Sequence, residues 1–394
     1  MLERRLAAAN AVAFSAAQGL AITLYPLLAE RTGLSLATLV ACFGVGSFLF
    51  LFGAPAWSAK SDEWGRVRVL AFGSLALAVS LFSLWLLVVV PSISSGVAFA
   101  ILSAGRVVYG LGASALVPVS QALREDLSAP AERARAMLDH SLGLGFGRVA
   151  GVAAVVLFAE EATRLVACAL VLVAALVAVN FSARASGPAP RPASGRSRAP
   201  KADTLPVGIL VVAFLFAIFA EALNSSLGGT LQAAFALDGV GASALGGRVL
   251  LAASVGVFVV QALARGLWRP APRRALVVGA LSLAAGASLF FSLGSFAALS
   301  LATAFFVVGL GLVPPAYLAL SRPSADSTSV GRRAGRLASV QTLGYAVGAL
   351  VSAFAFRFGG GAIAPWLLGL ALGIAAWAAL RQGAWLPLRT EKSA

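Results

Sequence analysis

The chain has 394 residues, of which 60% are hydrophobic and only 11% are charged. This composition excludes an ordinary soluble globular protein. The net charge of +15 would suit a nucleic-acid binder, but the basic residues are distributed too unevenly along the chain for that interpretation. We therefore expect an all-α integral membrane protein that binds no nucleic acid.

Twelve apolar runs are long enough to cross a bilayer, which takes about 20 residues each. They lie at about 6–28, 36–57, 69–90, 97–120, 138–159, 163–181, 206–229, 245–264, 275–293, 295–320, 335–357 and 362–380. The first run follows Arg4 and Arg5 as in a signal peptide, but its length and the spans after it indicate a retained helix. Little chain is left for a soluble domain.

The basic residues predict the orientation of these spans. All but six of the 30 Lys and Arg residues fall on the side that holds both termini. Arg31, Arg164 and Arg357 fall on the other side, and Arg106, Arg148 and Arg248 lie in or at the edge of spans. By the positive-inside rule both termini are cytoplasmic. We expect a monomer in the inner membrane of a bacterium, surrounded by membrane lipid.

The chain divides into two halves that resemble one another. Residues 182–205 are rich in Pro, Ser, Gly and Arg and predict a flexible cytoplasmic linker between bundles at 1–181 and 206–394. Matching residues recur in order in the two halves: Arg68, Gly73 and Leu77 with Arg274, Gly279 and Leu283; Gly143 and Gly147 with Gly344 and Gly348; Gly110 and Gly112 with Gly309 and Gly311. Duplication predicts two pseudo-symmetric six-helix bundles with a site at their interface.

Motifs for catalysis, metals and cofactors are missing from the sequence. It contains no H-E-x-x-H, G-x-S-x-G or P-loop pattern. Its two cysteines, Cys42 and Cys168, lie in spans and predict no disulfide framework. His140 is the single histidine, too few for a metal site, although it follows Asp139 and could titrate near neutral pH. We expect no enzyme, no metal and no cofactor.

Three motifs lie in the first half of the chain. The loop after the second span reads P-A-W-S-A-K-S-D-E-W-G-R, with Asp62, Gly65 and Arg66. The fourth span reads R-V-V-Y-G-L-G from Arg106, with Pro118 shortly after Gly110 and Gly112. The fifth span carries Gly143, Gly147 and Gly151 at every fourth position, on one helix face, and Arg148 beside them.

These motifs resemble the major facilitator superfamily. Its loop signature, close to G-x-L-a-D-R-x-G-R-R, is matched at Asp62, Gly65 and Arg66, whereas Ser58, Lys60 and Glu63 depart from it. The resemblance implies a cytoplasmic gating loop and, for Arg106, a role in proton coupling; the alternative is a structural arginine. Family exporters that exchange protons for drugs have a proline where Arg148 stands, and this additional cation could bind an anionic substrate.

Glu221 is the one carboxylate deep inside a predicted span. Burial raises the pKa of such a carboxyl group, and a nearby cation lowers it. Glu221 could therefore carry protons or form a fixed ion pair. The polar residues of the spans could bind substrate or join helices; they are Asn10, Gln18 and Tyr25 in span 1, Asn224 in span 7, and Gln341 and Tyr345 in span 11.

The sequence as a whole favours a secondary transporter that works by alternating access. We expect export of a small organic molecule, such as a drug, a metabolite or a siderophore-like chelator, in exchange for protons. The alternative is uptake by proton symport. A membrane-embedded enzyme or a sensor fits the motif content less well.

Overall fold

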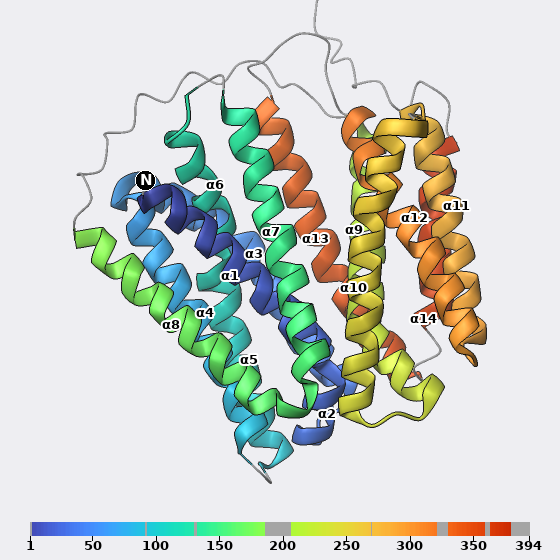
Figure 1. Cartoon of the computed structure of the whole chain (residues 1–394), viewed down its shortest axis with the longest axis horizontal. Coiled ribbons are helices and arrows are strands. Elements are labelled where there is room, and N and C mark those ends of the chain that lie inside the picture. Colours follow the sequence, from blue (N-terminus) through green and yellow to red (C-terminus); the bar gives the residue numbers. More distant parts are fainter. Residues whose placement is uncertain are drawn as a thin grey trace, which may run out of the picture. The chain divides into compact units, whose positions relative to one another are not determined.

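The structure is a computed structural model that describes residues 2–90, 93–129, 132–185, 206–268, 270–320, 330–358 and 363–379. The described part is helical apart from short connections, so the all-α prediction is confirmed (Figure 1). The helices of the first half are α1 (Leu2–Thr23), α2 (Tyr25–Thr32), α3 (Leu36–Trp64), α4 (Arg66–Val89), α5 (Ser95–Gly112), α6 (Leu116–Asp126), α7 (Arg133–Phe158) and α8 (Ala162–Ala185). Those of the second half are α9 (Val207–Phe235), α10 (Gly239–Leu263), α11 (Pro272–Leu289), α12 (Phe296–Leu320), α13 (Val330–Arg357) and α14 (Ile363–Ala379).

Proline explains why two predicted spans consist of more than one helix. Pro26 stands at the start of α2, so the first span is interrupted after Thr23. In the fourth span a 3₁₀ turn, Ala113–Ala115, separates α5 from α6, and Pro118 lies in the first turn of α6. A proline lacks the backbone N–H and crowds the carbonyl four residues earlier, which here belongs to Ser114 in that turn.

Length and hydropathy support the membrane assignment. Within the described residues, nine segments are long and apolar enough to cross a bilayer. One of them, Asp139–Ala183, contains two predicted spans, while α14 is apolar but shorter, with 17 residues. The remaining predicted span corresponds to α11, which has 18 residues and begins beside Arg273 and Arg274. The twelve-helix fold is therefore confirmed.

Two compact units make up the chain. The first contains Met1–Ser197 and Ala236–Leu251, and the second contains Arg198–Phe235 and Ala252–Ala394. The beginning of α10 thus groups with the first unit and its remainder with the second. The predicted linker at 182–205 lies almost wholly outside the described residues, and the bundle boundaries at 181 and 206 remain a proposal.

The same helix pairs recur in each unit, as duplication predicts. In the first unit α1 packs on α7, α4 on α8, and α4 on α5; in the second, α9 packs on α13, α11 on α14, and α11 on α12. Gly147 lies against the backbone of Val12 in α1, and Gly348 lies against the backbone of Ile218 in α9. The sequence match between these glycines therefore corresponds to equivalent helix contacts.

The second glycine match has a different register. Sequence pairs Gly110 with Gly309, but Gly110 packs on α3, at Gly46 and Leu49, whereas Gly309 packs on α11. It is Gly311 that packs on α10, the counterpart of α3. The two G-L-G motifs therefore lie on equivalent helices, but the helix contact that the first glycine makes in one motif is made by the second glycine in the other.

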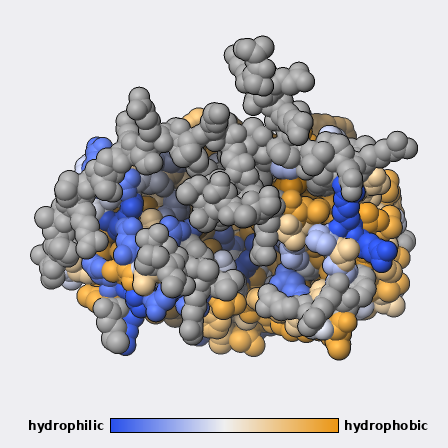
Figure 2. Space-filling model, turned by 90° about the horizontal axis from the view of Figure 1, so that it is seen from above, coloured by the Kyte–Doolittle hydropathy of each residue, from blue (hydrophilic) through white to orange (hydrophobic). Residues whose placement is uncertain are grey.

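The end of the molecule at which α1 begins is visible in Figure 2. Patches of hydrophilic and of hydrophobic residues are both visible there. Exposed apolar side chains such as Leu157, Val171 and Leu172 continue along α7 and α8. In a bilayer these faces contact lipid.

We expect the glycine face of α7 to be required for stability. A Cβ added at Gly147 would collide with the backbone of Val12, while one added at Gly143 would lie 3.8 Å from the Val12 side chain, an ordinary contact. Overpacking costs about 1–3 kcal/mol. Gly147→Ala should therefore lower the thermal unfolding midpoint of the purified protein, and the control Gly143→Ala should not. Equal midpoints for the two variants would contradict this packing.

Candidate functional site

Arg106 lies on α5 with only 5% of its surface exposed. Its guanidinium stacks on two aromatic rings, 3.8 Å from the ring centre of Tyr109 and 4.2 Å from that of Phe43. The Nε atom has no hydrogen-bond partner within the described residues, and no carboxylate there pairs with the side chain. A desolvated cation gains about 2 kcal/mol or more from such a ring face. Arg106 is therefore held by aromatic faces in place of a counter-ion.

The rings that hold Arg106 are themselves fixed by neighbouring helices. Tyr109 stacks on Phe14 of α1 with ring centres 5.9 Å apart, and Phe43 of α3 contacts Tyr25 at 4.5 Å. Tyr25, predicted to bind substrate, is 2% exposed and belongs to this aromatic cage. Gly46 completes the cage, because a Cβ there would lie 3.0 Å from Nε of Arg106. Phe50 of α3 packs on Tyr109 with ring centres 5.2 Å apart and on Phe14 at 5.8 Å. We use "aromatic cage" for Phe14, Tyr25, Phe43, Phe50 and Tyr109.

Arg148 lies where α7 packs on α1. Its backbone oxygen would be 2.6 Å from a Cβ added at Gly19 of α1, and Gly147, one residue earlier, lies against the backbone of Val12. The side chain is half-buried and makes no ion pair or hydrogen bond with any described residue. An arginine at this depth is costly unless it faces protein, water or a ligand.

The polar residues of α1 have different surroundings. Asn10 is fully buried and exchanges two hydrogen bonds of 3.1 Å with Asn180 of α8, which also donates to Ser74 of α4 at 3.1 Å. These bonds join three helices, so the amide of Asn10 is engaged in packing. Gln18 is half-buried, and its side chain makes no hydrogen bond with a described residue. Of the two, Gln18 is the better candidate for a substrate contact.

In the second unit Glu221 lies at the contact of α9 with α13. Its Cβ is close to Gly348, and the residue is half-buried. Ser225 donates to the backbone oxygen of Glu221 at 2.6 Å, and Ser352 donates to that of Ala222 at 2.9 Å. Because Gly348 has no side chain, the backbones of α9 and α13 approach closely there. Glu221 therefore lies at a tightly packed helix contact that also contains polar groups.

Tyr317 contacts the predicted site residue Gln341, although the sequence did not indicate it. It is 1% exposed, and its hydroxyl accepts a 2.6 Å hydrogen bond from the side-chain amide of Gln341. Tyr345 follows Gln341 by one turn of α13 and is 39% exposed. Gln341 is thus held by Tyr317, whereas Tyr345 and the half-buried Asn224 on α9 are more exposed than Tyr317. In the sequence Tyr317 is a single tyrosine in an apolar run shortly after Pro314 and Pro315, and nothing in that pattern indicates a contact with Gln341.

Asp139 and His140 lie near the beginning of α7. Asp139 is exposed, while His140 is 3% exposed. Neither ring nitrogen of His140 has a hydrogen-bond partner in the described part of the chain. The two residues are adjacent in sequence but differ in exposure.

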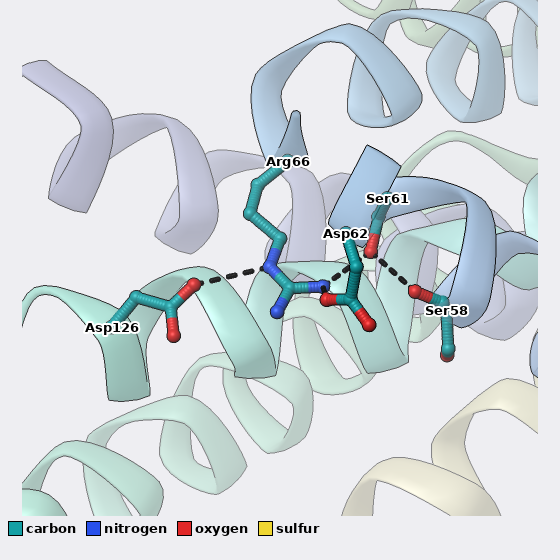
Figure 3. A network of polar contacts seen from close by, with 5 residues as sticks. All are labelled: Ser58, Ser61, Asp62, Arg66 and Asp126. Atoms are coloured by element: carbon teal, nitrogen blue, oxygen red, sulfur yellow. Dashed lines mark hydrogen bonds and ion pairs between the residues drawn. The ribbon is translucent and has the colours of Figure 1, made fainter. Parts of the chain in front are cut away.

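The predicted gating loop forms an ion-pair network centred on Arg66 (Figure 3). Its guanidinium contacts Asp62 at 2.7 Å and Asp126, at the end of α6, at 3.1 Å. It also donates to Ser61, whose hydroxyl donates to the backbone oxygen of Ser58 at 2.7 Å. Arg66 therefore joins the end of α3 to the end of α6, within the first unit.

Gly65 provides the turn that this network needs. It stands between α3 and α4 with φ of 89°, in the left-handed region that favours glycine. The turn places Arg66, the first residue of α4, back over Asp62 in the last turn of α3. The spacing of the motif residues is thus explained by local geometry.

Comparison with known proteins identifies the family. The family model described as Major Facilitator Superfamily matches residues 6–264, which is more than half of the chain. The chain therefore belongs to the major facilitator superfamily, and it is a secondary transporter of small molecules, not an enzyme. No curated protein matches its sequence.

Solved structures share the fold over nearly the whole chain. The human organic anion transporter MFSD10 (TETRAN) has a TM-score of 0.63 and 20% identity, with 95% of this chain and 98% of that chain covered. A mutant of the nucleoside transporter NupG has a TM-score of 0.70 and 13% identity, covering 96% and 99%. A D-xylose-proton symporter has a TM-score of 0.67 and 14% identity, covering 94% and 96%. At these identities the likeness shows the fold alone.

Proposed function

We propose that the protein exports a small organic anion in exchange for protons. The observation that carries the proposal is the half-buried guanidinium of Arg148, which no described residue neutralises. An uncompensated cation inside a membrane protein is costly, and a negatively charged substrate would offset that cost. A carboxylate-bearing drug, metabolite or siderophore-like chelator has this chemistry.

Two further residues support coupling to protons. Arg106 is a buried cation held by rings, and Glu221 is the one acid deep in a predicted span. A carboxylate is neutral in apolar surroundings and releases its proton when a cation approaches. Movement of the two units during transport would change the surroundings of Glu221 in this way. The proposed direction, export, comes from the resemblance of the fourth and fifth spans to proton-coupled exporters.

The test compares two arginines in transport assays. In inside-out vesicles with an imposed pH gradient, Arg148→Gln should lower uptake of organic anions about tenfold or more and leave neutral substrates less affected, since one charge contact is lost. Arg248→Gln is the matched control, because Arg248 is exposed and lies on the face of α10 opposite Gly239. Equal losses for anionic and neutral substrates, or no loss, would contradict the proposal.

A further inference from the structure

The exposed stripe of α4 ends in an arginine. Leu75, Val79 and Phe82 are exposed and follow one another at the spacing of one helix face, which in a bilayer contacts lipid. Phe72 and Arg68 continue the same spacing toward the beginning of α4. At about 1.5 Å per residue, Arg68 lies about 21 Å along the axis from Phe82, which is most of a hydrocarbon core of about 30 Å. Arg68 therefore stands where the acyl chains of the bilayer meet the lipid headgroups.

Aromatic rings surround this end of the stripe. Trp64 of α3 packs on Phe72 with ring centres 6.1 Å apart, and Trp57, two turns earlier in α3, stacks on the same ring at 6.5 Å. Phe72 also meets the edge of Phe181 in α8 at 5.9 Å. The indole N–H of Trp57 donates to the backbone oxygen of Leu111 at 2.6 Å, which fixes the orientation of this ring. Tryptophan is enriched at the depth of the headgroups, so these rings are typical of the edge of a membrane.

Trp64 contacts two cations. Nζ of Lys60 lies 4.9 Å from the ring centre, and the guanidinium carbon of Arg68 lies 5.2 Å from it. Lys60 also forms an ion pair with Glu63 at 2.9 Å, so its charge is compensated. The Nε atom of Arg68 is buried without a hydrogen-bond partner, and no carboxylate in the described part of the chain pairs with this side chain.

The other acids near this turn belong to a different arginine. Asp62 and Asp126 both pair with Arg66, at the centre of the network in Figure 3. Residues two apart do not face each other on a helix, so Arg68 does not share these partners. Arg68 thus has an aromatic neighbour and a position at the end of the lipid-facing stripe, but its charge is not compensated by a described residue.

We propose that Arg68, together with Lys60 and Trp64, binds the phosphodiester of an anionic phospholipid. A planar guanidinium can donate to two oxygens of one phosphate, and the ammonium supplies a further donor. The acyl chains would lie along the stripe of Leu75 and Val79. Free phosphate has the same charge but no acyl chains, so the apolar stripe favours the lipid. On the predicted topology this end is cytoplasmic, where basic side chains attract anionic lipid. The inference does not depend on the proposed anion export.

The test is a lipid titration of the purified protein in a neutral detergent. Phosphatidylglycerol should raise the thermal unfolding midpoint more than phosphatidylcholine with the same acyl chains. Arg68→Gln should raise the mole fraction of phosphatidylglycerol needed for half of this shift about fivefold or more, because one cation near the lipid phosphate is lost. Arg5→Gln is the matched control and should titrate as the parent. Arg5 is an exposed arginine of α1, whose beginning contacts the end of α6 through Arg4 and so lies at the same end of the first unit.

A second variant and a soluble anion make the outcome decisive. Trp64→Leu keeps both cations but removes the ring that holds them, so it should also weaken the response to phosphatidylglycerol, by a smaller factor. Inorganic phosphate should not raise the midpoint; a shift as large as that of the lipid would overturn the assignment to a phospholipid. Equal shifts with the two lipids would overturn the inference, even if Arg68→Gln failed to fold. Parent-like titration of both Arg68→Gln and Trp64→Leu would overturn it as well.

Discussion

Glu221→Gln should abolish the response of transport to a pH gradient while leaving the protein folded. Glutamine has nearly the shape of glutamic acid but cannot release a proton. The hydrogen bonds that Ser225 and Ser352 make near this position use hydroxyls and backbone oxygens, which the substitution does not remove. Facilitated movement of substrate down its own gradient should therefore persist.

The measurement is accumulation of substrate in inside-out vesicles with and without an imposed pH gradient. The parent should concentrate substrate only with the gradient, and Glu221→Gln should reach the same level in both conditions, a loss of about tenfold or more if proton transfer is obligatory. Glu160→Gln, at an exposed acid beyond α7, is the control and should behave as the parent. If Glu221→Gln still concentrates substrate, the proton carrier is another residue, and Asp139 and His140 are the next to test.

The sequence was most informative where local rules decide the structure. Spans follow from runs of apolar residues, the interruption near Pro118 from the missing N–H, and the close approach of α7 to α1 from glycines four residues apart. The turn at Gly65 likewise follows from its motif. Each of these features depends on residues within one or two helical turns.

Features that depend on distant pairs were not predictable from one sequence. The sequence makes Asn10 a candidate for substrate contact but gives no sign of its hydrogen bond with Asn180, 170 residues later. Glu30 resembles any charged residue at a helix end, and the backbone N–H that its carboxylate binds, at Gly239, lies 209 residues away. Tyr317 gained a role only through Gln341 on another helix. Hydrophobic periodicity carries no information on which polar side chains meet across helices.

The aromatic cage leads to the second large effect, at Arg106. Arg106→Lys keeps the positive charge but replaces a planar guanidinium, which can stack between Phe43 and Tyr109, with a compact ammonium that prefers water. The ammonium would leave the ring faces or draw water into the cage. We therefore expect Arg106→Lys to lose gradient-driven accumulation about tenfold or more, although the charge itself is retained.

A graded variant distinguishes coupling from a purely structural role of Arg106. Gly46→Ala leaves Arg106 intact but places a Cβ 3.0 Å from its Nε, so the guanidinium must shift by a few tenths of an ångström. If Arg106 serves coupling, Gly46→Ala should reduce accumulation of substrate while changing the thermal unfolding midpoint little. Arg106→Lys should reduce accumulation further. If both variants lose stability while the folded protein accumulates substrate normally, Arg106 acts only in packing. A cation held by rings can turn toward an anion or a carboxylate without first breaking an ion pair, and this gives the cage a physical use in a transporter.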